Sequence, residues 1–246
     1  MKITLLADVH ANLPALEAVL AHAESQGAYG MILNLGDFVG YGAFPEAVVR
    51  RLCDLGALSV IGNYDQKVIN RKMVESDWAR VKKPDKRLAF RFAYEHLSAS
   101  SRAQLMMVPE TRRLNLDDIS ILMTHAGPES MEEFIGPKTP IGRLYELAEM
   151  AAADVILCGH THLPFYKQAG RATFINPGSV GRPDDGDPRA SYAVLNIDKG
   201  KLSVEFFRVE YDVEAAVAGI HAAELPEIFA QMHIQGRNYD DVIGKK

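Results

Sequence analysis

Short apolar runs recur along this 246-residue chain, and each of the first three ends on a polar cluster. These runs are residues 3–7, 31–35 and 58–61. Runs of this length, bounded by polar turn residues, are typical of buried strands. The intervening segments, 14–25 and 44–55, place apolar residues at helical spacing and carry a proline near their start. The alternation of strand and helix predicts a parallel sheet covered by helices.

Residues 66–107 interrupt this alternation with a long helix-like stretch that contains Trp78. We expect a helical insertion or cap here. The basic run from Lys82 to Arg91 is interpreted as a solvated helix face, with a substrate clamp as the alternative.

The strand pattern resumes after the insertion and the chain then becomes richer in β-branched and aromatic residues. Strands are predicted at 119–123, 155–158, 173–175, 191–197 and 202–209, with a helix at 142–152 and a hairpin turn at 198–200. A helical tail is predicted at 213–246. Because no low-complexity tract or Gly/Ser linker divides the chain, we expect a single domain over 1–246.

Composition and charge exclude several classes of protein. A net charge of -5 and a pI near 5.9 argue against a nucleic-acid or membrane-surface partner, because such partners attract a cationic excess. No apolar run has the length of a membrane span, and the N-terminus lacks the pattern of a signal peptide. Cys53 and Cys158 form no CxxC pair, so we expect a reducing, cytoplasmic setting.

Residues able to bind a metal ion stand directly after the predicted strands. They are Asp8 and His10, Asp37, Asn63, His125, and His160 with His162. Sites in open α/β sheets form at the carboxyl ends of strands, so these side chains are expected to converge on one cleft. Imidazole, carboxylate and amide donors without thiolate suit manganese, iron, nickel or zinc better than calcium. One carboxylate can bridge two cations, and Asp37 is the candidate because of its central place in the series.

The order and spacing of these motifs resemble those of the calcineurin-like metallophosphoesterases over nearly the whole chain. The motifs are Asp8-Val9-His10-Ala11-Asn12, Gly36-Asp37, Gly62-Asn63-Tyr64-Asp65, Thr124-His125-Ala126 and Gly159-His160-Thr161-His162. Two further segments, 36–42 and 176–181, resemble the small bacterial and archaeal phosphodiesterases and the diadenosine tetraphosphatase-like proteins.

The resemblance implies a fold, a cofactor and a ligand set. The fold is an α/β class, four-layer α/β/β/α sandwich of two mostly parallel or mixed sheets with a helical insertion. The cofactor is a pair of divalent metal ions, manganese first, with iron, nickel or zinc as alternatives. Asp8, His10 and His162 would bind the first ion, Asn63, His125 and His160 would bind the second, and Asp37 would bridge them.

The implied activity is hydrolysis of a phosphodiester or phosphoanhydride bond in a small phosphate ester or nucleotide. Tyr64 and Asp65 are the candidate catalytic residues, although many relatives have histidine at the position of Tyr64. Asn12 and Arg182 are the candidate substrate-binding residues, and Arg189 is a further candidate cation. The sequence leaves open whether Tyr64 acts on the leaving group or only lines the cleft, and whether the chain forms a homo-oligomer.

Other readings of these residues are less favoured. Gly-Asp and Gly-Asn pairs often form turns only, and for Asp37 alone that reading would prevail. Gly40 and Gly42 do not make a dinucleotide-binding motif, because Pro45 replaces the third glycine. Ser179 does not stand in a nucleophile elbow, because Pro177 replaces its first glycine. The main alternative is a catalytically silent binding scaffold on the same fold, against which the complete ligand set argues.

Overall fold

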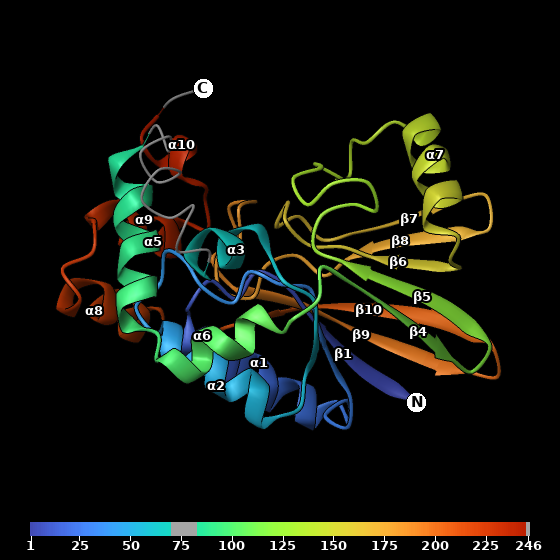
Figure 1. Ribbon diagram of the computed structural model, residues 1–246, viewed down its shortest axis with the longest axis horizontal. Coiled ribbons are helices and arrows are strands. Elements are labelled where there is room, and N and C mark those ends of the chain that lie inside the picture. The colour runs from blue at the N-terminus through green and yellow to red at the C-terminus, as the bar shows by residue number, and fades with distance from the viewer. Residues whose placement is uncertain (70–82, 245–246) are drawn as a thin grey trace.

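The computed structural model describes residues 1–69 and 83–244, and it contains two five-stranded sheets that face each other (Figure 1). The first sheet has the order β10-β9-β1-β2-β3. Its strands are β1 (Lys2–Leu6), β2 (Ile32–Asn34), β3 (Leu58–Ser59), β9 (Ala190–Asp198) and β10 (Lys201–Val209). The three N-terminal strands run parallel, whereas β9 and β10 add on as an antiparallel hairpin.

The second sheet has the order β4-β5-β6-β8-β7. Its strands are β4 (Thr111–Leu116), β5 (Ile119–Thr124), β6 (Val155–Leu157), β7 (Phe165–Ala169) and β8 (Ala172–Asn176). The central strands β5, β6 and β8 are parallel, and both edge strands are antiparallel to their neighbours. Both sheets are therefore mixed, as predicted.

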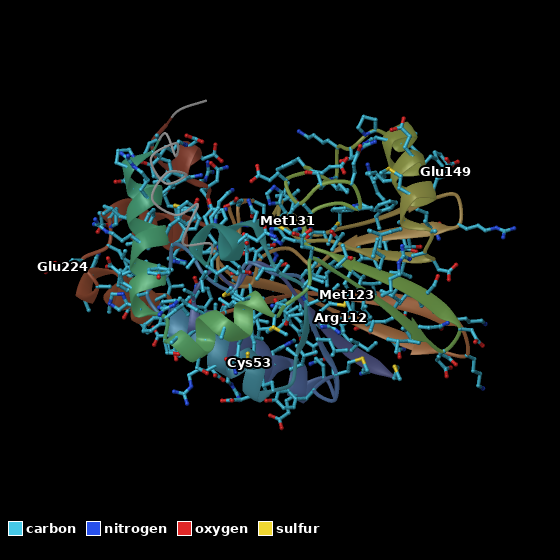
Figure 2. All side chains as sticks on the ribbon, in the orientation of Figure 1. Cys53, Arg112, Met123, Met131, Glu149 and Glu224 are labelled. Atoms are coloured by element: carbon cyan, nitrogen blue, oxygen red, sulfur yellow. The ribbon has the colours of Figure 1, made fainter. Side chains whose placement is uncertain are left out.

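Side-chain alternation along the strands builds the layers. In β1, Ile3 and Leu5 belong to the core between the sheets, whereas Leu6 belongs to the core under the helices. Met123 of β5, labelled in Figure 2, is fully buried in the same inter-sheet core. Each fully buried aliphatic side chain of this kind contributes roughly 1.5–3 kcal/mol. The period of two therefore makes each central strand bury both of its faces.

Helices cover the outer face of each sheet and complete the predicted four-layer sandwich. The helices α1 (Leu13–Ser25) and α2 (Pro45–Asp54) cover the first sheet, and α7 (Ile141–Ala151) covers the second (Figure 1). The start of α1 is fixed by Asn12, whose side-chain oxygen accepts a hydrogen bond from the Ala15 amide at 3.1 Å. Pro14 occupies the first turn, where a missing amide hydrogen costs nothing.

The remaining helices gather beside the first sheet (Figure 1). They are α3 (Asn63–Ile69), α5 (Pro84–His96), α6 (Ala99–Met106), α8 (Val213–Ala222), α9 (Glu227–Gln235) and α10 (Tyr239–Val242). The C-terminal helices pack on α5: the Tyr239 hydroxyl donates to Asp85 at 2.6 Å, and Lys83 pairs with Asp240. Ala89 of α5, Tyr41 and Phe229 of α9 share one apolar cluster.

The structure bears on several expectations from the sequence. The expected inner strands and helices are present within a few residues of their predicted bounds, and α8 begins at Val213. The apolar-run pattern does not predict the edge strands β4 and β7, because their exposed faces carry polar and charged residues. Trp78 and Lys82 lie outside the described residues. Within the described part of the chain, none of the helices combines the length and apolar character needed to cross a membrane.

His233 anchors the C-terminal helices to the start of α1. Its side chain is 2% exposed, and its Nδ1 lies 3.3 Å from the side-chain nitrogen of Asn12. Burial, reinforced by the charge of Arg182, lowers the pKa of His233 to about 4. The folded chain therefore holds this imidazole neutral at pH values where the unfolded chain protonates it.

His233→Asn is expected to change how stability depends on pH. The pKa of His233 rises from about 4 in the folded chain to about 6.5 when unfolded. Its contribution is thus complete above pH 6.5 and falls, as the pH drops toward 4, by up to about 1.4 kcal/mol per pH unit. Asparagine keeps an acceptor near Asn12 but does not titrate. Urea unfolding between pH 7 and 5 should show a smaller loss of stability for the variant than for the parent.

The exposed Ile234 on the same helix supplies the control, because Ile234→Asn introduces asparagine without removing a titratable group and should follow the parent's pH dependence. Parallel stability curves for the parent and His233→Asn would contradict the buried-neutral assignment.

Candidate metal centre

The carboxyl ends of strands from both sheets meet at one point and bring the predicted metal ligands together. Asp8 follows β1, Asp37 follows β2, and Asn63 opens α3 after β3, whereas His125 follows β5 and His160 and His162 follow β6. Within the described residues, two groups have ligand atoms that all lie within 4.8 Å of one another. One is Asp8, His10 and His162, and the other is Asp8, Asp37 and His125.

Three of the histidines are held with Nδ1 against a backbone carbonyl. The rings are those of His10, His125 and His162, and the acceptors are the carbonyl oxygens of Val39, Leu35 and Arg182 at 3.2, 2.7 and 2.7 Å. Because a carbonyl can only accept, Nδ1 carries the hydrogen and Nε2 presents a bare lone pair. The Nε2 atoms of His10 and His162 face each other at 3.1 Å. Two lone pairs so close favour a cation between them, so the donors fit a metal ion.

Burial sets the protonation of this cluster. It lowers the pKa of His10 and His125, and brings the pKa of His160 to about 4 and that of His162 to about 3. The imidazoles are therefore neutral near pH 7, the form that binds metals. Burial raises the pKa of Asp8 and of Asp37, and the charge of Asp8 raises that of Asp37 further. A cation between these carboxylates would relieve both effects.

Asp37 is placed to link two sets of ligands. Its Oδ2 lies 3.7 Å from Nε2 of His10 and 3.6 Å from Nε2 of His125, which belong to the two predicted ion sites. Its Oδ1 accepts the Tyr64 amide at 2.8 Å, which fixes the orientation of the carboxylate. Asp8 also belongs to both groups of ligand atoms, so the carboxylates together join the two halves of the centre.

Asn63 and His160 complete the set on the side of His125. The Oδ1 of Asn63 lies 3.1 Å from Nε2 of His125. The ring of His160 packs edge-on against that of His125 at 5.2 Å between centroids, and its backbone amide donates to Asp8 at 3.0 Å. All seven predicted ligands therefore lie in one cluster, with His160 placed by its ring contact.

The backbone is left-handed at most of these ligands. The φ angles of Asp8, His10, Asp37, His160 and His162 are 55°, 47°, 53°, 66° and 59°. Such conformations cost on the order of 1–3 kcal/mol each and persist only where the surroundings enforce them. They turn the chain sharply at the strand ends, so that neighbouring side chains point into the same centre.

Asp65, a predicted catalytic residue, makes backbone contacts next to two of the metal-capable residues. Its side chain is fully buried, and its two oxygens accept the backbone amides of Val39 at 3.1 Å and Gly62 at 2.9 Å. Burial, and then the charge of Asp37, raise its pKa. These contacts indicate that Asp65 positions the loops carrying Asp37 and Asn63.

Asn12 is likewise occupied by structural contacts. Its side chain is 1% exposed, accepts from Ala15 and donates to the carbonyl of Gly181 at 2.9 Å. Asn12 caps α1 and ties it to the loop after β8, and its predicted substrate contact stays a prediction. Ser179 supports the same loop, since its hydroxyl donates to the Asp8 carbonyl at 2.7 Å and accepts the Arg182 amide at 2.8 Å.

Tyr64 stands beside the centre together with Tyr41, a residue to which the sequence assigned no role. Both rings meet the His10 ring edge-on, at 5.2 Å for Tyr64 and 5.5 Å for Tyr41, and their hydroxyls share a hydrogen bond. Burial, and then Tyr41, raise the pKa of Tyr64, which makes its phenol a weaker proton donor. In the sequence, the only signal for Tyr41 is its position between Gly40 and Gly42. In the structure, a Cβ at Gly40 would lie 2.7 Å from the Tyr64 ring, so this glycine leaves room for the ring.

The two candidate arginines differ in place. Arg182 is buried, stacks on Tyr41 at 4.4 Å from the ring centroid, and contacts Asp184 at 3.2 Å. Its Nε has no hydrogen-bond partner among the described residues, which leaves a buried donor beside the ligands. Arg189 instead pairs with Asp187 at the surface. Of the two candidate arginines, Arg182 therefore lies beside the metal-capable residues and Arg189 does not.

Comparisons with known proteins agree with this geometry. Residues 1–200 match the calcineurin-like phosphoesterase superfamily domain. A metallophosphoesterase of Sphaerobacter thermophilus superposes with a TM-score of 0.79 at 32% identity, covering 96% of this chain and 100% of its own. The protein MJ0912 of Methanocaldococcus jannaschii is 31% identical, covering 96% of this chain and 98% of its own. The phosphodiesterase YfcE of Escherichia coli K12 is 29% identical, covering 80% and 89%.

Asp65→Asn is expected to weaken metal binding without abolishing catalysis. One oxygen becomes an amide nitrogen that faces a backbone amide of Val39 or Gly62, so one turn loses its acceptor. Changes in residues that support metal ligands typically cost 10–100-fold in affinity or activity, and we expect about tenfold in affinity. Calorimetric titration with Mn²⁺ measures this loss.

Turnover at saturating metal should then recover most of the parent's value. A fall in kcat of several orders of magnitude in the fully metal-loaded variant would instead assign Asp65 a catalytic role.

Proposed function

Because the chain belongs to the calcineurin-like phosphoesterase superfamily, we propose that this metal-dependent phosphoesterase hydrolyses phosphodiester or phosphoanhydride bonds with two divalent ions. The observation that carries the proposal is the orientation of His10, His125 and His162, whose Nδ1 atoms are bound to carbonyls while Nε2 faces the buried carboxylates. Around these lone pairs, the Asn63 side chain lies 3.1 Å from Nε2 of His125, and Nη2 of Arg182 lies 3.5 Å from Nε2 of His162.

Each ion has its own set of ligands in this proposal. Asp8, His10 and His162 would hold the first, Asn63, His125 and His160 would hold the second, and Asp37 would contribute to both. Manganese suits these nitrogen and oxygen donors, with iron, nickel or zinc as alternatives. When bound, such a pair supplies charge neutralisation at the phosphoryl group and a water acidic enough to attack near neutral pH.

The residues around the centre bind and orient the substrate. Arg182 offers its unpaired Nε–H to a phosphoryl oxygen, and its stacking on Tyr41 limits the positions of the guanidinium. Tyr64, whose hydroxyl shares a hydrogen bond with that of Tyr41, lines the same side of the centre. Val180, in the segment between β8 and β9 that also carries Arg182, is fully buried in the core under the helices.

The substrate class is a small phosphate ester or nucleotide, and the setting is the cytoplasm. Similarity to the phosphodiesterase YfcE supports the diester preference. The paired hydroxyl of Tyr64 supports substrates whose leaving group departs without a strong proton donor. A silent scaffold is the rival function, but it would not require metal-capable side chains to converge at the strand ends.

The parent protein is expected to bind about two equivalents of Mn²⁺. Asp37→Asn should abolish most of its activity. The amide removes the charge shared by both ion sites, so activity on bis(p-nitrophenyl) phosphate should fall by more than about a hundredfold, beyond the usual effect of a supporting residue. Metal content by mass spectrometry and initial rates measure the two effects together.

Asp54→Asn, at the exposed end of α2, is the matched control and should behave as the parent. A parent that neither binds metal nor cleaves the ester across manganese, nickel, iron and zinc would favour the scaffold. Unchanged metal content and turnover in Asp37→Asn would remove the bridging role.

Tyr64→His tests whether the tyrosine restricts the leaving group. Alkoxides need a proton on departure, and an imidazolium titrates near neutral pH whereas a phenol does not. We expect the parent to cleave aryl diesters well and alkyl monoesters poorly. The variant should raise the ratio of alkyl to aryl turnover by about tenfold or more, within the range of general acid catalysis.

Metal content must be equal in both proteins for this comparison. If the alkyl-to-aryl ratio is the same in parent and variant, Tyr64 does not act on the leaving group and only lines the site.

A further inference from the structure

Three cations surround the Tyr41–Tyr64 pair beside the metal centre. The Nζ of Lys67 lies 5.7 Å from the Tyr64 ring centroid, whereas Nζ of Lys86 lies 6.0 Å and Cζ of Arg182 lies 4.4 Å from that of Tyr41. Cations at such distances are attracted to the faces of aromatic rings. The two tyrosines therefore lie against three cationic side chains, although the whole chain has a net charge of -5.

Lys86 differs from the other two cations in its partners. Lys67 pairs with Glu132 at 2.8 Å, and Arg182 contacts Asp184 at 3.2 Å. Lys86 makes no ion pair with a carboxylate in the described part of the chain. Lys83, three residues earlier in the chain, forms an ion pair with Asp240. The ammonium of Lys86 is thus available to an external anion.

The geometry of α5 directs Lys86 to the tyrosines. Lys86, Ala89 and Phe90 are spaced i, i+3 and i+4, so they share one helix face. Ala89 and Phe90 are each 2% exposed, and the Phe90 ring lies 5.0 Å from that of Tyr64. Arg91 is exposed on another face, where it lines a groove between α5 and α8. Within its described residues, the basic run therefore places Lys86 on the face of α5 that packs toward Tyr64 and Tyr41.

We propose that Lys86 binds a second, non-scissile phosphate of the substrate. This inference rests on the proposed hydrolysis at the metal centre. An isolated phosphodiester carries about one negative charge, for which the ions and Arg182 suffice. An additional unpaired cation beside them suits a substrate with a further phosphate group. A lysine on a flexible stem recognises phosphate as a point charge and tolerates several geometries.

The substrate class that follows is a phosphoric ester or anhydride with at least one more phosphate next to the scissile one. Lys86 then acts as a specificity-determining residue. It would discriminate such compounds from simple diesters by binding them more tightly, without contact with the bond that breaks.

The test compares binding of orthophosphate and pyrophosphate to the manganese-loaded protein. Calorimetry at a fixed free Mn²⁺ concentration gives the ratio of the two dissociation constants for the parent, Lys86→Gln and Lys86→Arg. We expect pyrophosphate to bind the parent more tightly than orthophosphate. Lys86→Gln should reduce that preference about tenfold, as expected for one charge-assisted contact, and Lys86→Arg should retain most of it.

Arg91→Gln is the matched control, because it removes the same charge from the exposed face of the same helix. It should keep the parent's preference and the parent's rate on bis(p-nitrophenyl) phosphate. An equal preference in Lys86→Gln and the parent would overturn the proposal, as would an equal loss in Arg91→Gln. So would a parent that binds pyrophosphate no better than orthophosphate. A parent that cleaves no ester contradicts the proposed function instead, while the binding ratio still reports on Lys86.

Discussion

Two carboxylates, Asp8 and Asp37, are buried close together where the two sheets meet, and the surrounding structure is arranged to hold them there. Removing an ionised carboxylate from water costs several kcal/mol even after relaxation, and like charges add to this cost. The amides of His160 and Tyr64 donate to the pair, and the bare nitrogens of three histidines face it. Since these groups come from both sheets, the charge balance of the centre also joins the two halves of the sandwich.

The same site shows how backbone strain is supported. Left-handed turns at Asp8 and Asp37 would relax in an isolated peptide, because non-glycine residues avoid this conformation. Here Asp65 clamps the turns after β2 and β3, and the Ser179 hydroxyl clamps the turn after β1. The side-chain amide of Asn176 donates a hydrogen bond to the Gly159 carbonyl and so supports the turn after β6. Buried polar side chains around the ligands thus replace the regular ladder hydrogen bonds that the strands lose at their ends.

Local patterns were enough to predict the inner strands, the covering helices and the convergence of metal-capable side chains at the strand ends. Strand and helix periods repeat within a few residues, and the ligands sit directly after the strands. Contacts between distant segments could not be predicted in this way. Asp65 reads as a motif residue, yet its role depends on Val39, a residue of another loop. Tyr41 and Lys86 gain their places only when α5 packs against the loop after β2, and β4 lacks an apolar run because one of its faces is exposed.

Arg182 connects the metal ligands to parts of the chain outside the matched family region. Its carbonyl accepts the Nδ1–H of His162, and its guanidinium stacks on Tyr41. The ring of Tyr41 in turn meets that of Phe229 on α9 at 5.1 Å, beyond residue 200 where the family match ends. The C-terminal helices therefore form part of the wall that positions the guanidinium. In the proposed function, the strand ends would therefore supply the metal ligands and the added helices would support the wall that selects the substrate, so the two tasks would fall to different parts of the fold.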